Sequence, residues 1–173
     1  MRSSITIKKK IGKFNKTIHV SGDKSLSIRW ALLASQAKGR SRAYNLLKSL
    51  DVISALNCLK KLGIKVKFKK NYCEIESSGL NSFRKKKNII LNAGNSGTLG
   101  RLILGLLVHY NNKIKIIGDK SLSKRDFSRV TAPLKKFGAS FNYRNKFKLP
   151  VEIVGLNNAK PIKYFETKGS AQC

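Results

Sequence analysis

Leu59-Lys60-Lys61-Leu62-Gly63 returns later in the chain, almost unchanged, as Leu134-Lys135-Lys136-Phe137-Gly138. Each copy ends a run with apolar residues at helical spacing, and its glycine suits the position just after a helix. Alternating apolar and polar residues come after both glycines, which is typical of strands. The pair therefore predicts an internal repeat in which a helix leads into a hairpin.

The repeat extends to both sides of these stretches. For the first copy we expect strands at 5–11 and 17–20, helices from Ser25 to Gly39 and from an N-cap at Asp51, and a hairpin of 64–68 with 73–76. For the second copy we expect strands at 89–91 and 114–117, helices at 101–107 and 128–137, and a hairpin of 139–143 with 151–154. The second copy has the order βαβαββ. We interpret the first copy as the same unit, so the fold class is α/β with repeated βαβαββ units.

This organisation divides the chain into four segments. We expect N-terminal strands over 1–18, a first unit over 19–85, a second unit over 86–158, and the start of a third unit over 159–173.

The chain has 37 Lys and Arg residues against 8 Asp and Glu, a formal net charge of +29. Such an excess is typical of proteins that bind nucleic acid or anionic surfaces. Here the charges are spread as pairs and triplets such as Lys8-Lys9-Lys10 and Lys135-Lys136. We attribute most of them to solvated surface positions, and we expect small anionic substrates and no nucleic-acid partner.

The thiols and imidazoles show no metal-binding spacing. Cys58, Cys73 and Cys173 form no CxxC pair, and His19 and His109 lie far apart. We therefore expect no metal site and no disulfide framework. The N-terminus lacks the continuous apolar run of a signal peptide, and no window is long and apolar enough to cross a membrane. We expect a cytoplasmic protein with no membrane partner.

The octet GDKSLSxR occurs at 22–29 and again at 118–125. A polar loop with Gly, Lys and Ser at the start of a helix can bind an anion, because the first backbone N–H groups are unpaired and the helix dipole is positive there. Arg29 lies four residues after Ser25, so both fall on one helical face and can bind the same anion. The octets occupy different positions of the repeat, because the first precedes the first helix of its unit and the second precedes the second helix.

The stretch Gly94-Asn95-Ser96-Gly97-Thr98-Leu99-Gly100-Arg101 has a similar design. Its glycines allow a ligand to approach the backbone, and Arg101 lies just inside the expected helix. It lacks the Gly-Lys-Ser/Thr ending of a Walker A loop. Three such loops in a chain with few acids indicate a ligand with several negative groups.

Four stretches, in order, resemble one enzyme family: SGDKSLSIRWALLA, LNAGNSGTLGRLILGLL, IIGDKSLSKRDFSRVTAPLKKFGA and KGSAQ. The family is 5-enolpyruvylshikimate-3-phosphate (EPSP) synthase, and the resemblance spans nearly the whole chain. It implies the inverse α/β barrel of enolpyruvyl transferases, here truncated to about two units of one lobe. It also implies transfer of the enolpyruvyl group of phosphoenolpyruvate to the 5-hydroxyl of shikimate 3-phosphate, in a monomeric enzyme without cofactors.

The resemblance also assigns residues to the two substrates. Phosphoenolpyruvate is expected to contact Lys24, Asn95, Gly97, Arg125 and Gln172, with Gly97 where a side chain would crowd the inhibitor glyphosate. Shikimate 3-phosphate is expected to contact Lys24, Ser25, Arg29, Ser170, Ala171 and Gln172.

Two departures from the family pattern affect these expectations. Asp126 stands where the family usually has proline, and its carboxylate can compete for Arg125. The family is also more than twice as long as this chain, and its acidic base and its catalytic lysine and glutamate lie in a second lobe. We expect a fragment that binds anions weakly and has no activity alone, and we assign it no certain catalytic residue.

Two alternatives remain open. The sister transferase acting on UDP-N-acetylglucosamine shares fold and chemistry, but it presents a reactive cysteine, whereas Cys58 and Cys73 fall in a helix and a strand. A basic nucleic-acid-binding module would interleave aromatic residues with Arg on one face. Tyr72, Phe68, Phe137 and Phe141 instead fall on hairpins or on apolar helix faces.

Overall fold

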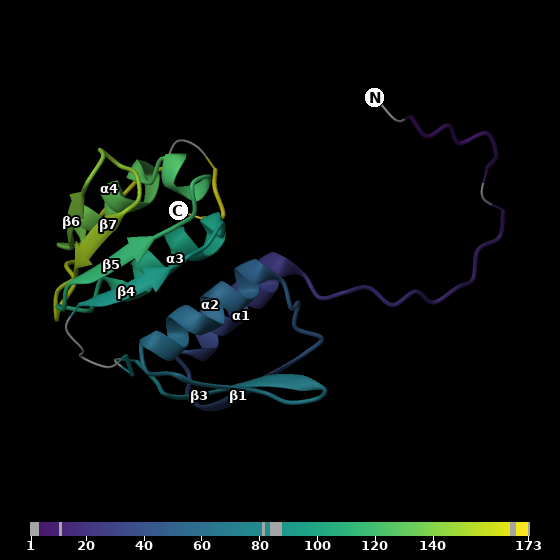
Figure 1. Ribbon diagram of the computed structural model, residues 1–173, viewed down its shortest axis with the longest axis horizontal. Helices are drawn as coiled ribbons and strands as arrows, with labels where there is room; N and C mark the ends of the chain where they lie inside the picture. The colour runs from purple at the N-terminus through teal and green to yellow at the C-terminus, as the bar shows by residue number, and fades with distance from the viewer. Residues whose placement is uncertain (1–3, 11, 81, 84–87, 167–168, 173) are drawn as a thin grey trace.

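The computed structural model describes residues 4–10, 12–80, 82–83, 88–166 and 169–172. Two α/β units come after an extended N-terminal segment, and each unit has its own sheet (Figure 1). We call residues 24–78 the first unit and residues 89–154 the second unit.

The first unit has two helices and three strands. Its elements are α1 (Lys24–Ala34), β1 (Lys38–Tyr44), α2 (Leu50–Lys61), β2 (Lys65–Phe68) and β3 (Tyr72–Ser78). The strand order is β1-β3-β2, and both pairs are antiparallel. The predicted hairpin of β2 and β3 is confirmed.

The second unit contains the complete predicted order. Its elements are β4 (Ile89–Asn92), α3 (Gly97–Leu107), β5 (Ile114–Ile117), the short 3-10 helix η1 (Leu122–Lys124), α4 (Ser128–Lys136), β6 (Ser140–Tyr143) and β7 (Val151–Val154). The strand order is β4-β5-β7-β6, with β4 parallel to β5 and the other pairs antiparallel.

The repeated stretch closes the second helix of each unit in the same way. Gly63 lies directly after the C-cap of α2 with a φ of 93°, and Gly138 lies directly after the C-cap of α4 with a φ of 109°. The N–H of Ile64 donates to the Leu59 carbonyl at 3.0 Å, and the N–H of Ala139 donates to the Leu134 carbonyl at 3.3 Å. This Schellman pattern satisfies carbonyls that the helix leaves unpaired. A side chain is strained at such a φ, so glycine sets both helix ends.

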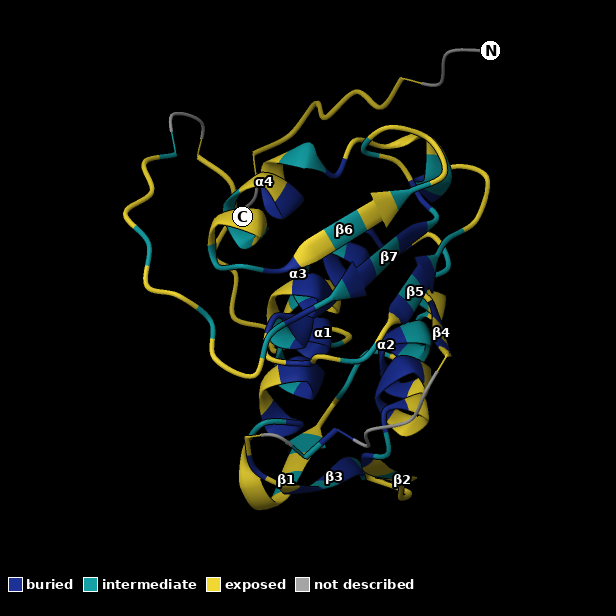
Figure 2. Ribbon diagram, turned by 90° about the vertical axis from the view of Figure 1, so that its left-hand side faces the viewer, coloured by how far each residue is buried: buried dark blue, intermediate teal, exposed yellow. Residues whose placement is uncertain are grey.

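The core lies where the helices meet the two sheets. Helices α1 and α2 separate the first sheet from the second unit (Figure 1), and buried residues line their facing sides (Figure 2). Leu56 and Leu59 of α2 are almost fully buried, and each such side chain contributes about 1.5–3 kcal/mol of hydrophobic stabilisation. The thiol of Cys58 donates to the Asn92 carbonyl at 3.4 Å, so α2 also contacts the edge of β4.

The two strands predicted before α1 are wrong in this structure. Residues 5–10 and 17–20 form no strand, and their exposed apolar side chains include Ile5, Ile7, Ile18 and Val20. Ile11 lies outside the described residues. Alternation alone did not suffice, because a strand needs a neighbour to pair its backbone N–H and C=O groups.

Three helix boundaries also differ from the sequence prediction. Helix α3 begins at Gly97, four residues before the predicted start at Arg101. Helix α1 ends at Ala34, and Gly39 lies inside β1 with a φ of 103°. The N-cap of α2 is Ser49, so Asp51 lies in the first turn instead. There its carboxylate still faces the positive end of the helix dipole.

The sheets differ at one edge. In the second unit, β4 lies along β5 and completes four strands. In the described part of the first unit, β1 pairs only with β3, so its other edge carries no strand.

Candidate functional site

The first loop of interest begins α1. The Asp23 carboxylate caps the helix by accepting from the N–H of Leu26 at 2.7 Å. One turn further on, Arg29 donates through Nη1 to the Ser25 carbonyl at 3.4 Å, as their four-residue spacing predicts. Its Nη2 donates to the carbonyl of Ala171 at 2.9 Å. Arg29 therefore brings the C-terminal turn 170–172 to the start of α1.

The second loop begins α3 and is flanked by two arginines. Ser96 caps this helix by accepting from the N–H of Leu99 at 3.2 Å. A Cβ added to Gly97 would lie 2.9 Å from Nη1 of Arg101 and 3.0 Å from Nη1 of Arg125. Two guanidinium groups thus reach the helix terminus where unpaired N–H groups and the dipole already favour an anion. Only a residue without a side chain leaves this space open.

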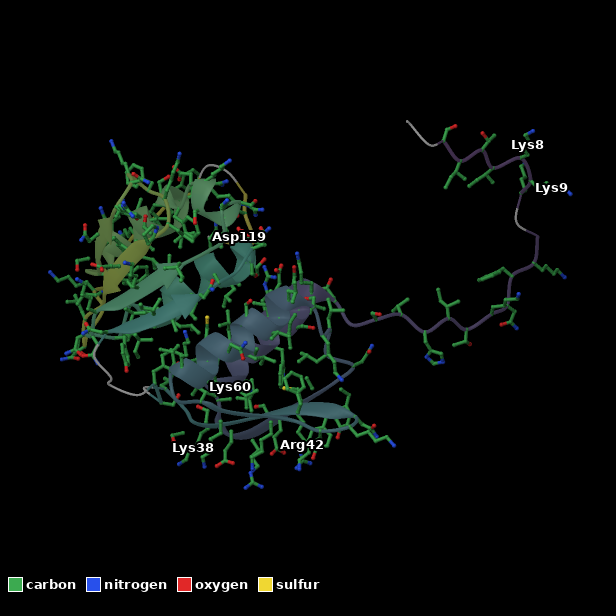
Figure 3. The ribbon with its side chains drawn as sticks, in the orientation of Figure 1. Lys8, Lys9, Lys38, Arg42, Lys60 and Asp119 are labelled. Carbon is green, nitrogen blue, oxygen red and sulfur yellow. The ribbon has the colours of Figure 1, made fainter. Side chains whose placement is uncertain are left out.

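The second octet delivers Arg125 to this place. The N–H of Asp119 donates to the Gly94 carbonyl at 2.9 Å, which joins the octet to the glycine-rich loop. Asp119 lies where the second unit approaches the start of α1 in the view of Figure 3. Arg125 comes directly after η1 in an extended conformation, and its Nη2 donates to Oδ1 of Asn95 at 3.3 Å.

Gln172 connects these groups through its side-chain amide. Its Oε1 accepts from Nη1 of Arg101 at 3.0 Å, and its Nε2 donates to Oγ1 of Thr98 at 3.1 Å. Its backbone N–H donates to Oγ of Ser170 at 3.2 Å. A hollow of about 720 Å³ opens beside these contacts, and Arg101, Ser170 and Gln172 lie on its wall.

Lys24 has a different partner. Its Nζ lies 3.3 Å from Oδ2 of Asp51, and the lysine side chain is half exposed. The structure thus brings Asn95, Gly97 and Arg125 together, and it joins Arg29 with Ala171, while it pairs Lys24 with a carboxylate of α2. Asp51 was predicted as a helix cap and its role beside Lys24 was missed, because only the tertiary fold brings the two together.

Arg101 and Thr98 belong to the predicted anion-binding loop at 94–101, but neither was assigned to a substrate. The signal for Arg101 was present, since it lies four residues after Gly97 as Arg29 lies four residues after Ser25. Thr98 had no signal of its own, because its role depends on the distant Gln172.

Asp126 was expected to compete for Arg125. Its carboxylate instead accepts from the N–H of Ser128 at 2.7 Å and from the hydroxyl of the same serine. Its backbone carbonyl accepts from Nη2 of Arg101 at 3.2 Å. The carboxylate thus pairs with the first residue of α4, at the helix end that favours negative charge.

Other charges are dispersed over the molecule. The cations labelled in Figure 3 lie on the N-terminal segment, on the first sheet and on α2. Within the sheet, Nε of Arg42 lies 2.8 Å from Oε2 of Glu74, and Nζ of Lys65 lies 3.1 Å from Oε1 of Glu76. These hydrogen bonds favour the charged carboxylates and lower the pKa of Glu74 and of Glu76.

The two described cysteines have the properties of core residues. Cys58 and Cys73 are buried, and Cys173 lies outside the described residues. Burial disfavours the thiolate and raises the pKa of Cys58 to about 11, and it also raises the pKa of Cys73. Neither thiol has the reactive character expected for the sister transferase.

Among the described residues, no cluster of His, Cys, Asp and Glu side chains could hold a metal ion. No helix in the described part of the chain is both long and apolar enough to span a membrane.

Comparison with known proteins identifies what this arrangement resembles. A sequence model of EPSP synthase (3-phosphoshikimate 1-carboxyvinyltransferase) matches residues 8–173. The 3-phosphoshikimate 1-carboxyvinyltransferase of Streptococcus suis is 38% identical over 167 residues, which cover 96% of this chain and 39% of that protein. The enzyme of the same name from Streptococcus pyogenes serotype M4 is 39% identical over 162 residues, covering 93% of this chain and 38% of that protein.

A solved structure agrees with the sequence relatives. EPSP synthase from Acinetobacter baumannii superposes with a TM-score of 0.83 at 31% identity, over 90% of this chain and 35% of that chain. The chain therefore spans less than half the length of the proteins it matches, and closure into an inverse barrel stays a prediction. The predicted α/β fold and the predicted family are confirmed, and the chain belongs to the EPSP synthase family.

Proposed function

We propose that the loops at the starts of α1 and α3 bind shikimate 3-phosphate and phosphoenolpyruvate side by side. The site serves transfer of the enolpyruvyl group to the 5-hydroxyl of shikimate 3-phosphate, with release of phosphate. The observation that carries this proposal is the approach of the Arg125 guanidinium group to Gly97 at the start of α3. Such a site suits ligands with several negative charges, because charge-assisted hydrogen bonds to guanidinium are strong and directional.

The contacts divide in the way that the proposed substrates require. Arg29 meets Ala171, and both are assigned to shikimate 3-phosphate together with Ser25 and Ser170. Arg125 separately contacts Asn95 and lies next to Gly97. This supports the assignment of these three residues to phosphoenolpyruvate.

Gln172 and Lys24 are assigned to both substrates. The side-chain amide of Gln172 reaches Arg101 and Thr98 of α3, while the neighbouring Ala171 is bonded to Arg29 of α1. Gln172 thus lies between the two groups of contacts. Lys24 begins α1 and can turn from Asp51 to an anionic ligand, because its side chain is half exposed.

Proton transfer needs acidic or basic groups within hydrogen-bond reach of the substrates. Every one of the eight acids, all of them in the described part of the chain, has a partner of its own. These acids are Asp23, Asp51, Glu74, Glu76, Asp119, Asp126, Glu152 and Glu166. We therefore propose that the chain alone binds the substrates without turnover.

The proposed setting is that of the family. The site uses no cofactor, and the protein acts in the cytoplasm as a monomer in its full-length form, without nucleic-acid or membrane partners.

Calorimetric titration of the purified chain with shikimate 3-phosphate and with phosphoenolpyruvate, at moderate salt, tests the proposal. Arg29→Ala should weaken binding of shikimate 3-phosphate about tenfold or more, because a hydrogen bond to a charged group contributes about 1.5–3 kcal/mol. Arg125→Ala should weaken phosphoenolpyruvate binding to a similar extent. Arg144→Ala, in the loop after β6, removes an equal charge outside the site and should leave both affinities unchanged.

Failure of the folded chain to bind either substrate would contradict the proposal. Measurable product formation by the chain alone would contradict the part that denies turnover.

A further inference from the structure

Arg101 joins three segments that are distant in the sequence. It belongs to α3, it donates to the side chain of Gln172 in the C-terminal turn, and it donates to the Asp126 carbonyl after the second octet. We propose that Arg101 is a positioning residue, which fixes the side-chain amide of Gln172 and thereby the C-terminal turn 170–172 at the anion site. This inference rests on the proposed function for its effect on binding.

The chemistry of guanidinium determines how the amide is oriented. Arginine has only donors, so the atom of Gln172 that meets it has to be the oxygen. The amide nitrogen then points the other way, and it donates to Thr98 at 3.1 Å. An amide NH₂ carries a second N–H, which this orientation leaves to the site for an anionic oxygen. Arg101 therefore selects the donor face of Gln172.

Arg101 can do this because its own guanidinium is held in place. Its Nη2 donates to the Asp126 carbonyl at 3.2 Å, and its Cζ lies 5.1 Å from the ring centroid of Phe127. Phe127 is fully buried. A guanidinium over a buried ring, with donors directed to two acceptors, keeps a fixed plane.

The same ring also limits the backbone of α3. A Cβ at Gly100 would lie 3.4 Å from two atoms of the Phe127 ring, so the helix and the ring lie about one methyl group apart. Packing of α3 beside this buried ring supports the position of Arg101, and Arg101 in turn holds Gln172.

A direct ligand and a positioning residue predict different mutant behaviour. If Arg101 acts through Gln172, Arg101→Ala and Gln172→Ala should each weaken shikimate 3-phosphate binding about tenfold, and the double mutant should be no weaker than either. Arg101→Lys keeps the charge but not the planar fork, so it should recover little of the loss. Additive losses, or full recovery with lysine, would overturn the inference.

A second readout needs no ligand. In an NMR spectrum of ¹⁵N-labelled chain, the two side-chain amide protons of Gln172, assigned by their loss in Gln172→Ala, should be shifted away from free glutamine. Arg101→Ala and Arg101→Lys should move them towards free values, whereas Arg144→Ala should not. Amide hydrogen exchange in the C-terminal turn should accelerate in the same two variants.

The two readouts separate this inference from the proposed function. Shifted Gln172 protons in a wild-type chain that binds neither substrate would support the positioning role and contradict the proposed function. If instead the wild-type chain binds the substrates but Arg101→Lys does not move the Gln172 protons, the proposed function is supported and the positioning role is contradicted. If Arg101→Ala does not fold, Arg101→Lys still provides the test. Thermal unfolding of each variant reports whether its core is intact.

Discussion

The two copies of Gly-Asp-Lys-Ser-Leu-Ser share a first turn and then diverge. In the first copy Asp23 accepts from the N–H of Leu26 at 2.7 Å, and in the second Asp119 accepts from the N–H of Leu122 at 2.7 Å. The first copy continues as the 11-residue helix α1, whereas the second forms η1, a 3-10 helix of 3 residues. The octet itself therefore determines the capped turn, whereas the tertiary surroundings determine how far the helix extends beyond it.

Burial explains the divergence. Leu26 is 68% exposed, whereas Leu122 is fully buried, and Phe127 continues the second copy into the core. The N–H of Phe127 donates to the Phe147 carbonyl at 2.8 Å, a bond that draws the chain out of a helix. As a result Arg29 stands on a helix and Arg125 on an extended segment, and both still reach the site.

The leucines should show the largest difference between the copies. Leu122→Ala empties a fully buried position and should lower the free energy of unfolding by about 2–5 kcal/mol. Leu26→Ala changes an exposed position and should stay within about 0.5 kcal/mol. Urea denaturation of both variants measures the two values, and equal losses would contradict the burial argument.

The glycines should differ next. A Cβ at Gly22 would lie 2.0 Å from the backbone oxygen of Asn45. Asn45 directly follows β1, so this oxygen cannot move unless the end of β1 moves too. A Cβ at Gly118 would meet Cδ2 and Cβ of Leu122 and Cδ1 of Leu149 at 2.8 to 3.0 Å, contacts that are longer and mostly to side-chain ends. Gly22→Ala should therefore cost about 3 kcal/mol and Gly118→Ala about 1 kcal/mol in the same denaturation experiment. The reverse order would show that the first octet is not held against Asn45.

The last serines of the two copies provide a third test. The hydroxyl of Ser27 accepts from the N–H of Leu47 at 3.1 Å and donates to the Asp23 carbonyl at 2.6 Å. The hydroxyl of Ser123 donates to the Gly118 carbonyl at 3.2 Å, its one side-chain bond among the described contacts. Ser27→Ala leaves the Leu47 N–H unpaired and should cost about 2 kcal/mol, against about 0.5 kcal/mol for Ser123→Ala. Thermal unfolding of the two variants measures both losses. Similar losses would show that the hydroxyl of Ser27 is not important for stability.

The caps should give the smallest difference between the two copies. Asp23→Ala and Asp119→Ala each remove one bond to a leucine N–H, so each should cost about 1 kcal/mol. Far-UV circular dichroism should separate them, because only Asp23 caps a long helix. A loss of helical signal in Asp119→Ala would contradict the difference between the copies.

The sequence predicted those features that short stretches determine. The two glycines after α2 and α4 marked their helix ends, and the spacing of Ser25 and Arg29 placed both at one helix terminus. The second octet was placed before the helix at 128–137, and it does precede α4, but the octet itself forms η1, which depends on the burial of Leu122.

The remaining site contacts join residues that are distant in the sequence. The pairing of Lys24 with Asp51 and that of Arg101 with Gln172 depend on how helices and loops pack, which periodicity does not encode. The two strands predicted before α1 were wrong for a related reason. A strand is defined by its partner, and alternation in one segment does not supply one.

The edge of β1 that carries no strand in the described part of the chain bears on how the protein behaves in concentrated solution. An unpaired strand edge is a template for another copy of the chain, and proteins guard such edges with charge. Here Lys38, Arg40 and Arg42 occupy the strand and outnumber the partner carboxylates Glu74 and Glu76, so two copies approaching edge to edge repel each other. Added salt screens this repulsion over about 8 Å at physiological ionic strength. The protein should therefore be most soluble in dilute buffer, and it should begin to self-associate as salt rises.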